Sequence, residues 1–376
     1  MWTPQNWYES GLAQGRAEGA HLRAVEDYKL ELLEVGLPGL SRKEIGALLA
    51  ENNAKRLSAA PDLSVYPELR GMRELIEAEQ RGICEGAGMD EVQAASHFNG
   101  HFFYHREVLT GRWVPKARCS VVFAPASDHG ALFGANLDSG EDEPYGAPDW
   151  PSGNEHFVMG GVSSGVYLDE ESPEIFPAPV MKLVERYCRN ADEAVEMLSR
   201  YNHFWGPGNF LVADRGGRTA MIEKTACRIA VRWSADGFGF VTAMTAEDPE
   251  MFAYLKERRA ASLVSRGLDD PCSDTRYWEL QDQRRVLMNR LMDEGRAKPT
   301  LDGVRGMLQY RGEDGMTCDN GDVLYPGDPP IEYTLRTFVT SLGEGRSWWW
   351  SRDKARDIPS WENPQEDVVY EGILKW

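Results

Sequence analysis

The stretch CSVVFAPASDHGALFGANLD, residues 119–138, decides the fold. Two apolar runs flank the turn residues SDHG at 127–130, and this pattern is typical of a β-hairpin. In an antiparallel pair, the start of one strand lies beside the end of its partner. The hairpin therefore brings a potential nucleophile, Cys119, close to a carboxylate, Asp138. We expect the Cys119 sulfur to line an open cleft beside that carboxylate.

The sequence before this hairpin has a helical pattern. Ser41 stands three residues before Glu44, which is typical of a capping box at the start of a helix. Polar and basic residues at 106–118 then predict a connector. The expected helices cover about 6–35, 41–57, 67–83 and 88–98.

From residue 119 onward, short β-type runs alternate with helical segments, and the Gly-, Pro- and acid-rich stretch 139–155 predicts a long surface loop. This order indicates an α+β fold, a layered αββα arrangement with mainly antiparallel sheets. The expected strands cover 119–125, 131–137, 209–214, 218–224, 227–233, 238–243, 332–342 and 346–350. The expected helices cover about 178–201, 249–266, 273–294 and 300–309.

Composition limits the classes of partner. The chain has 376 residues and a formal net charge of −19, a field that repels nucleic-acid phosphates and anionic lipid. No apolar run approaches the roughly 18 residues that cross a bilayer, and the first residues lack a signal-peptide profile. We therefore expect a cytoplasmic protein with a small-molecule amide or acyl substrate and no nucleic-acid or membrane partner. The oligomeric state is left open.

Metal and cofactor signatures are weak. The six cysteines are widely spaced without a C-x-x-C pair, which predicts free thiols in a reducing compartment. GxGxxG and P-loop patterns do not occur, so we expect no cofactor. His97, His101 and His105 are spaced by four and could bind zinc on a helix. Gly100 and the flanking phenylalanines favour packed or cleft-lining histidines instead, so we predict no metal site.

A cysteine nucleophile needs a base or a depressed pKa, and the sequence shows no local Cys-His-Asn pattern. Cleavage of the bond between Arg118 and Cys119 would supply a base, because the freed α-amine has a pKa near 8. That amine could take the thiol proton and later protonate the leaving group. The thiolate would attack an acyl carbonyl to give an acyl-enzyme.

Several segments, in this order, carry a resemblance to a known family: SGLAQGRAEGAHL (10–22), ELIEAEQRGICEGAGMD (74–90), Cys119-Ser120, GALFGANLD (130–138), NADEAVEMLSRY (190–201), GNFLVADRGGRTAMIEKT (208–225) and TLRTFVTSL (334–342). With them the chain resembles the isopenicillin N acyltransferase family of cysteine N-terminal nucleophile hydrolases. The resemblance implies a precursor that cuts itself before the nucleophile. It also implies a four-layer αββα sandwich with the new N-terminus in the cleft.

The same resemblance implies two parts of the chain. Residues 1–118 would form a helical N-terminal segment, a pro-part or small subunit, and residues 119–376 the αββα catalytic core. Within the core, it implies that Cys119 is the nucleophile and that Asp138 is the acidic residue that orients or assists it.

Four further residues are candidates for supporting or substrate-binding roles. Ser120 and Asn136 belong to the same motif as the nucleophile and the acid. Arg118 precedes the bond to be cut, and Glu223 is implied as a substrate contact. A Glu at a strand end is more often solvated.

The chain departs from the family pattern at three places. Arg118 stands where the family has Gly, which reaches strained backbone geometries more readily. The segment FVTAMTAED (240–248) lacks the Asn of the family's Thr-Asn-His stretch, and Asp319 follows Cys318 where the family has Arg. Losing one oxyanion donor costs roughly 3 kcal/mol of transition-state stabilisation. Arg311 and Thr242 are candidate substitutes.

These observations leave three hypotheses open. The first is a cysteine N-terminal nucleophile amidohydrolase or acyltransferase that forms an acyl-enzyme at Cys119. The second is an unprocessed, non-catalytic relative that serves as a binding or scaffold module. The third is an enzyme that works uncut, with its thiol activated by a nearby base such as a histidine. Asp138 as a turn or N-cap residue is the structural alternative for the carboxylate.

Overall fold

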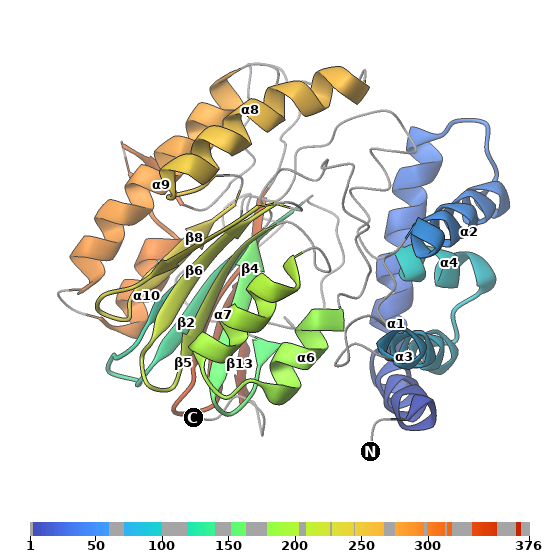
Figure 1. Cartoon of the computed structure of the whole chain (residues 1–376), viewed down its shortest axis with the longest axis horizontal. Coiled ribbons are helices and arrows are strands. Elements are labelled where there is room, and N and C mark those ends of the chain that lie inside the picture. The colour runs from blue at the N-terminus through green and yellow to red at the C-terminus, as the bar shows by residue number, and fades with distance from the viewer. Residues whose placement is uncertain are drawn as a thin grey trace.

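The computed structural model describes residues 3–59, 71–99, 119–139, 152–162, 179–202, 208–225, 228–243, 245–266, 275–296, 299–312, 314–317, 333–351 and 366–369. Two antiparallel sheets lie face to face between two layers of helices, and four further N-terminal helices lie on one side (Figure 1). The four-layer αββα sandwich and the helical N-terminal segment expected from the sequence are confirmed.

The N-terminal helices are α1 (Pro4–Gly36), α2 (Arg42–Ala59), α3 (Met72–Ala87) and α4 (Glu91–Asn99). The capping box predicted at α2 is confirmed, because the Ser41 amide donates to the Glu44 carboxylate at 2.8 Å and the Glu44 amide donates to the Ser41 hydroxyl at 3.4 Å. The third helix begins at residue 72, later than the expected 67.

Glycines allow α1 and α3 to touch backbone to backbone. A Cβ at Gly15 of α1 would lie 2.3 Å from the Ile83 carbonyl oxygen, and one at Gly82 of α3 would lie 2.2 Å from the Tyr8 carbonyl oxygen. Real Cβ atoms cannot approach a carbonyl this closely. The glycine spacing therefore fixes the register of the two helices.

Both sheets are antiparallel. The first has the strand order β13-β12-β11-β2-β1-β8, and the second has the order β3-β4-β5-β6-β7. The strands of the first are β1 (Ser120–Ala124), β2 (Leu132–Ser139), β8 (Gly239–Thr242), β11 (Tyr333–Ser341), β12 (Arg346–Ser351) and β13 (Glu366–Val369). Those of the second are β3 (Ser152–Gly153), β4 (Phe157–Val162), β5 (Gly208–Asp214), β6 (Thr219–Lys224) and β7 (Ile229–Trp233). A separate short pair is formed by β9 (Arg311–Gly312) and β10 (Gly315–Met316).

The predicted hairpin at 119–138 is confirmed. Strand β1 pairs with β2 in the register Ser120↔Asn136 to Ala124↔Leu132. Gly130 has a φ of 78° in the connecting turn, a conformation that glycine adopts without steric cost. Strand β1 also pairs with β8, so it lies in the interior of its sheet.

The two sheets pack through a large side chain opposite a glycine. Phe133 of β2 lies against Gly160 of β4, where a Cβ would meet the ring at 2.3 Å. Both strands are fully buried at this point. This contact sets the separation of the sheets.

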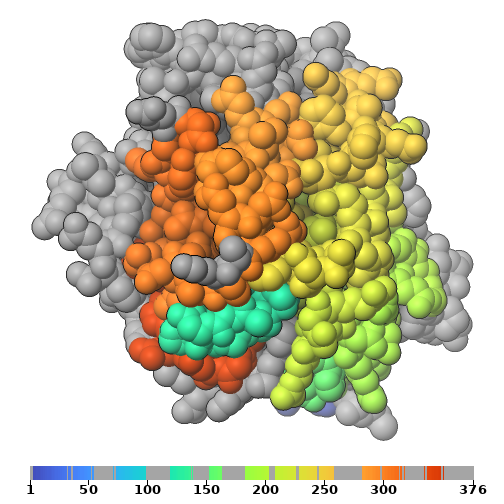
Figure 2. Space-filling model, turned by 90° about the vertical axis from the view of Figure 1, so that its left-hand side faces the viewer, coloured from blue at the N-terminus to red at the C-terminus, as the bar shows by residue number. Residues whose placement is uncertain are grey.

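Helices cover the outer faces of the sandwich. Helices α9 (Thr275–Arg296) and α10 (Leu301–Leu308) cover the first sheet. Figure 2 shows them in orange, with the teal β1–β2 hairpin emerging along their edge. Trp348 and Trp350 of β12 belong to the core beneath them. Helix α8 (Pro249–Arg266) contacts β7 through Ala230.

The second sheet is covered by α6 (Pro179–Tyr187) and α7 (Ala191–Arg200). The single helix expected at 178–201 is wrong, because it is interrupted before Asn190. The backbone of Asn190 is extended, and its side chain accepts a hydrogen bond from the Glu193 amide as an N-cap. Leu75 of α3 joins the same core, so the N-terminal helices pack on this layer.

Strand β4 was missed from the sequence. Its residues FVMGGV carry two glycines, which weaken a strand signal, although the sheet contact requires Gly160. It also adjoins the stretch 139–155 expected as a loop, of which residues 140–151 lie outside the described part. No helix within the described ranges is long and apolar enough to cross a membrane.

Candidate active site

The hairpin residues meet at one end of the first sheet. Cys119 directly precedes β1, where Ser120 pairs with Asn136 of β2 on one side and with Thr242 of β8 on the other. The carbonyl oxygen of Cys119 accepts a hydrogen bond from the Ala243 amide at 3.0 Å. The main chain of Cys119 is therefore held by the residue that follows β8.

The Cys119 thiol is buried in the intact chain. It is 5% exposed, and its sulfur lies 3.9 Å from the main-chain oxygen of Asp138. The expectation that the thiol lines an open cleft is wrong for the intact chain, because Cys119 directly precedes a buried interior strand. The structure does bring Cys119 and Asp138 together at the end of the hairpin.

Asp138 is fully buried and has strong polar partners. One carboxylate oxygen accepts from the Thr334 hydroxyl at 2.6 Å, and the other lies 3.2 Å from Nη1 of Arg284. Arg284, on α9, is 4% exposed and also donates from Nη2 to the Thr317 carbonyl at 2.6 Å. Asp138 is thus half of a buried ion pair rather than the turn or N-cap residue of the structural alternative.

The Cys119 thiol contacts the main chain of Asp138, whereas the Asp138 carboxylate contacts another element. The Asp138 side chain is directed to α9, and Asn136, two residues earlier on the same strand face, donates to the Leu308 carbonyl of α10 at 2.7 Å. The Cys119 sulfur contacts the main chain of Asp138 instead. The Arg284 cation therefore balances the charge of a residue whose backbone touches the thiol.

Asn136 and Ser120 differ in the number of hydrogen bonds that their side chains form. The Asn136 amide also donates to the Thr317 carbonyl at 3.1 Å, and its oxygen accepts from the Thr337 hydroxyl at 2.8 Å. This set of bonds ties β2 to α10 and to β11. Ser120 is fully buried, and its hydroxyl has no hydrogen-bond partner among the described residues.

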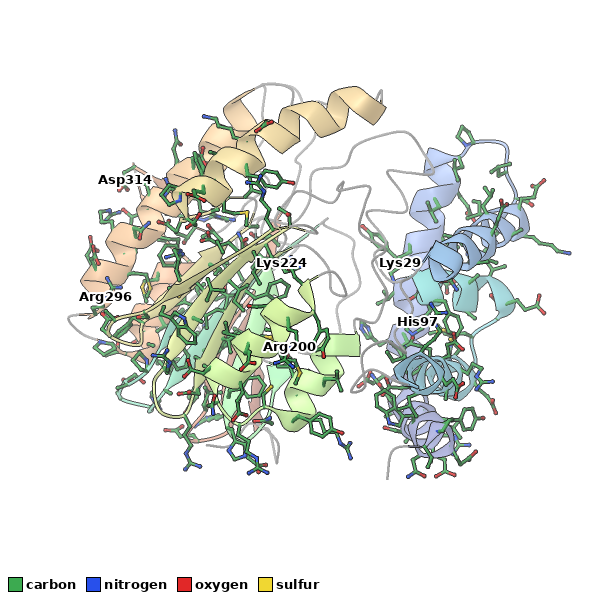
Figure 3. The ribbon with its side chains drawn as sticks, in the orientation of Figure 1. Lys29, His97, Arg200, Lys224, Arg296 and Asp314 are labelled. Atoms are coloured by element: carbon green, nitrogen blue, oxygen red, sulfur yellow. The ribbon has the colours of Figure 1, made fainter. Side chains whose placement is uncertain are left out.

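Glu223 is buried at the end of β6, so the expectation of a solvated strand-end carboxylate is wrong. Its two oxygens accept from the amides of Glu247 and Asp248 at 2.8 and 2.9 Å, and Arg232 lies 2.9 Å away. These bonds anchor the start of α8. Lys224 follows it, and Figure 3 shows Lys224 at this end of the sheets.

A small cavity of about 10 Å³ adjoins Glu223. Asn209 of β5, Thr242 of β8 and Arg285 of α9 contribute to its wall. This volume corresponds to about one water molecule. Thr242, a candidate substitute for the missing oxyanion donor, is 3% exposed here, and its carbonyl accepts from Asn209.

Other sequence candidates lie elsewhere. Arg311 is exposed on β9. His97 contacts Glu26 at 3.1 Å among the N-terminal helices, near Lys29 (Figure 3). The candidates that lie outside the described residues are Arg118, His101, His105, Cys318 and Asp319. Within the described part of the chain, no group of three or more His, Cys, Asp or Glu residues is placed to hold a metal ion.

Arg284 was not expected, although the sequence carries a signal for it. Leu287, Met288 and Leu291 follow it at helical spacing and are buried. An arginine at the end of such an apolar stripe lies on the buried face of its helix. A buried arginine requires a partner, and the partner is Asp138.

Comparisons with known proteins give structural matches only. No protein-family model matches the chain, and no curated protein matches its sequence. The structure is similar to a mutant of conjugated bile acid hydrolase from Clostridium perfringens, with 13% sequence identity, a TM-score of 0.37, and coverage of 67% of this chain and 96% of that chain. It is also similar to penicillin V acylase from Agrobacterium tumefaciens, with 12% identity, a TM-score of 0.34, and coverage of 63% and 86%.

A third similar structure is another variant of the Clostridium perfringens conjugated bile acid hydrolase, with 13% identity, a TM-score of 0.33, and coverage of 70% and 92%. With TM-scores this low, the fold assignment rests on the sheet order and layers of this chain. The resemblance to the isopenicillin N acyltransferase family stays a prediction from the sequence.

Proposed function

We propose that this protein is a cysteine amidohydrolase or acyltransferase of the N-terminal nucleophile type, acting on a small amide or acyl donor. Cys119 forms the acyl-enzyme after self-cleavage between Arg118 and Cys119. The observation that carries the proposal is the position of the thiol. It lies at the head of an interior strand, 3.9 Å from the main chain of Asp138, which is itself charge-paired in the interior.

The proposed chemistry starts from the cut. In the intact chain the nitrogen of Cys119 belongs to an amide and cannot act as a base. Cleavage converts it into an amine with a pKa near 8, close to that of a thiol. The amine takes the thiol proton, and the thiolate attacks the carbonyl carbon of the substrate. The amine then returns the proton to the leaving nitrogen, and water or an acceptor amine releases the acyl group.

Asp138 and Arg284 supply the electrostatic setting of this proposal. The new ammonium would form on the residue whose sulfur contacts the main chain of Asp138. The Asp138 carboxylate itself accepts from Thr334 and is paired with Arg284. An isolated carboxylate in the interior would be costly to keep ionised. The guanidinium lowers that cost. From the sequence resemblance we propose that Asp138 orients the amine of Cys119.

The N-terminal segment, residues 1–118, would remain attached after the cut. Trp7 of α1 and Leu75 and Ile76 of α3 pack into the core formed by α6, α7 and the second sheet. Apolar burial of this kind holds chains together without a covalent link. We therefore propose that the two fragments form a noncovalent pair and co-purify.

Intact mass spectrometry of the purified full chain tests self-cleavage. The proposal expects two fragments, residues 1–118 and 119–376, and an uncut Cys119→Ala variant. Cys84→Ala is the matched control, because Cys84 is a buried thiol in α3, and this variant should still be cut. A wild-type chain that stays at full mass, with a thiol at 119 that ignores acylating reagents, would contradict the proposal.

The second candidate function is a non-catalytic binding or scaffold module. The observation that favours it is the 5% exposure of Cys119 in the intact chain, together with the sequence departures at 118, 240–248 and 316–320.

A third outcome, thiol-dependent turnover by an uncut chain, would indicate a nearby base instead of the α-amine. A panel of acyl amides and thioesters separates these functions and narrows the substrate class. A reducing compartment such as the cytoplasm, which we propose from the scattered cysteines, would keep the thiol reduced.

A further inference from the structure

The connection between β8 and α8 holds the main chain of the proposed nucleophile. The described residues of this connection are 243 and 245–248, and the Ala243 amide donates to the Cys119 carbonyl at 3.0 Å. The position of Ala243 therefore sets the position of the Cys119 backbone. Whatever fixes Thr242, Ala243 and Thr245 therefore also holds the start of β1 on its β8 side.

Asn209 of β5 binds this connection from the opposite sheet. Its Nδ2 donates to the Thr242 carbonyl at 2.8 Å and to the Thr245 carbonyl at 2.6 Å. These two carbonyls lie on either side of Ala243 along the chain. Asn209 is 2% exposed, so its bonds form without competition from bulk water.

The amide nitrogen of Asn209 makes both bonds to the connection. Two carbonyl oxygens accept from one group, so that group must carry two hydrogens, which the Asn nitrogen does. The Asn209 oxygen has no hydrogen-bond partner among the described residues, and the side chain lines the cavity of about 10 Å³ beside Glu223. The donor half of the carboxamide therefore makes the bonds to the connection.

Downstream contacts hold the rest of the same connection. Glu223 accepts from the amides of Glu247 and Asp248, and the Thr245 hydroxyl donates to Asp282 of α9 at 3.0 Å. Of these anchors, Asn209 is the one that brackets Ala243. Its loss would free the part of the connection that touches Cys119 while the start of α8 stays anchored.

We propose that Asn209 is a positioning residue for Cys119, acting through Thr242, Thr245 and Ala243. This inference rests on the proposed function, in which the Cys119 backbone must be held for the thiolate to reach its carbonyl target. Misplacing a reacting group by about 1 Å costs about 100-fold in rate. The substitution Asn209→Asp keeps the shape but places one oxygen, in place of Nδ2, against both carbonyls.

The test compares Asn209→Asp with Asn154→Asp in the full-length protein. Asn154 also donates to two carbonyls, those of Glu185 and Cys188, at 2.8 and 2.9 Å. It precedes β4 at the end of the second sheet away from Asn209, because Phe157 pairs with Asp214 whereas Val162 pairs with Asn209. It is therefore a matched control for the loss of an Asn clamp.

We expect Asn209→Asp to lower kcat by about 100-fold with KM within about 2-fold of wild type. Hydrogen exchange at residues 241–245 should become at least about 10-fold faster. Asn154→Asp should lose comparable thermal stability while it keeps the wild-type kcat and the wild-type exchange at 241–245. Wild-type kcat in Asn209→Asp, or an equal loss of kcat in both variants, would overturn the inference.

A second readout separates this inference from the proposed function. If the wild-type protein shows no Cys119-dependent turnover, the proposed function fails, and the positioning role is then judged on exchange at Ala243 and on the alkylation rate of Cys119. Both should change in Asn209→Asp and stay unchanged in Asn154→Asp. Identical exchange and alkylation in wild type and Asn209→Asp would overturn the inference on their own.

Discussion

Arg284 and Asp138 form an ion pair that is almost completely removed from solvent, with Nη1 and Oδ2 3.2 Å apart and side chains 4% and 0% exposed. The pair links α9 to the end of β2, the strand whose last residues lie against Cys119. Desolvating two charges is costly, and the cost is recovered only when geometry and further hydrogen bonds are good. Here Thr334 and the Thr317 carbonyl supply those bonds.

Removal of the cation should destabilise the protein strongly. Arg284→Met leaves the Asp138 carboxylate buried without its charge partner, and we expect a loss of about 3–5 kcal/mol in the free energy of unfolding. Chemical denaturation of the purified variant measures this loss. Because Asp138 is also proposed to orient the Cys119 amine, the variant should lose turnover under conditions where it remains folded.

Two matched variants control this prediction. Arg290→Met, on the same helix, removes an exposed pairing with Glu294 and Asp314, and should cost under about 1 kcal/mol. The double variant Arg284→Met with Asp138→Asn should regain part of the stability, because no unpaired charge is left. A double variant no more stable than Arg284→Met alone would show that the ion pair is not the source of the loss.

The contact between Phe133 and Gly160 should make the sheet interface intolerant of even one methyl group. In Gly160→Ala the new Cβ would meet the Phe133 ring at 2.3 Å, and overpacking of this kind costs about 1–3 kcal/mol. Thermal or chemical unfolding measures the change. Replacing Phe133 with Leu in the same chain should relieve part of it.

Gly306 of α10 offers the opposite result as a control. A Cβ at this position would meet no heavy atom within 4 Å. In an open helical position, Gly→Ala stabilises by about 0.4–1 kcal/mol. If Gly160→Ala were as stable as Gly306→Ala, the described packing of the two sheets would be incorrect.

Two structural thiols should be unreactive while the protein is folded. Burial, with a further contribution from Glu26, raises the pKa of Cys84 to about 11. Burial, with Glu193 and Glu196, raises the pKa of Cys188 to about 12. Both groups therefore stay protonated at pH 7–9, and iodoacetamide should label them in that range only after unfolding.

These thiols also imply a direction for alkaline stability. Their folded-state pKa values lie above the ordinary value of about 8.5, so the unfolded chain loses these protons first. Their contribution is complete below that pH and is lost as pH rises toward 11 and 12. Cys84→Ala should show a weaker fall in stability above pH 9. Rapid labelling of Cys84 in the folded protein at pH 8 would contradict the burial described for it.

Local patterns predicted much of the fold. The hairpin at 119–138 followed from apolar runs around a turn, and the Ser41 capping box followed from side-chain spacing. Both depend on contacts within a few residues. The break at Asn190 was missed, because the apolar pattern continues through it on both sides and only the N-cap geometry stops the helix.

Features that depend on tertiary contacts were less predictable. Strand β4 carries Gly160, and a glycine is needed there only because the Phe133 ring of the other sheet packs against it. From the sequence, Glu223 resembled a solvated strand-end residue. Its burial depends on the amides of residues 247–248, which are distant along the chain. At the site, the sequence indicated Cys119 and Asp138 as a pair, but the Arg284 partner comes from a helix 146 residues further along the chain.

The most direct test of the account is to trap an acyl group on the protein with an activated acyl ester and to locate it by peptide mapping. We predict one acyl group per chain, on the sulfur of Cys119, in a peptide that begins at this residue. The adduct should disappear in Cys119→Ala and persist in Cys84→Ala. An unmodified Cys119 in folded protein exposed to the ester, with or without labels on other thiols, would contradict Cys119 as the nucleophile.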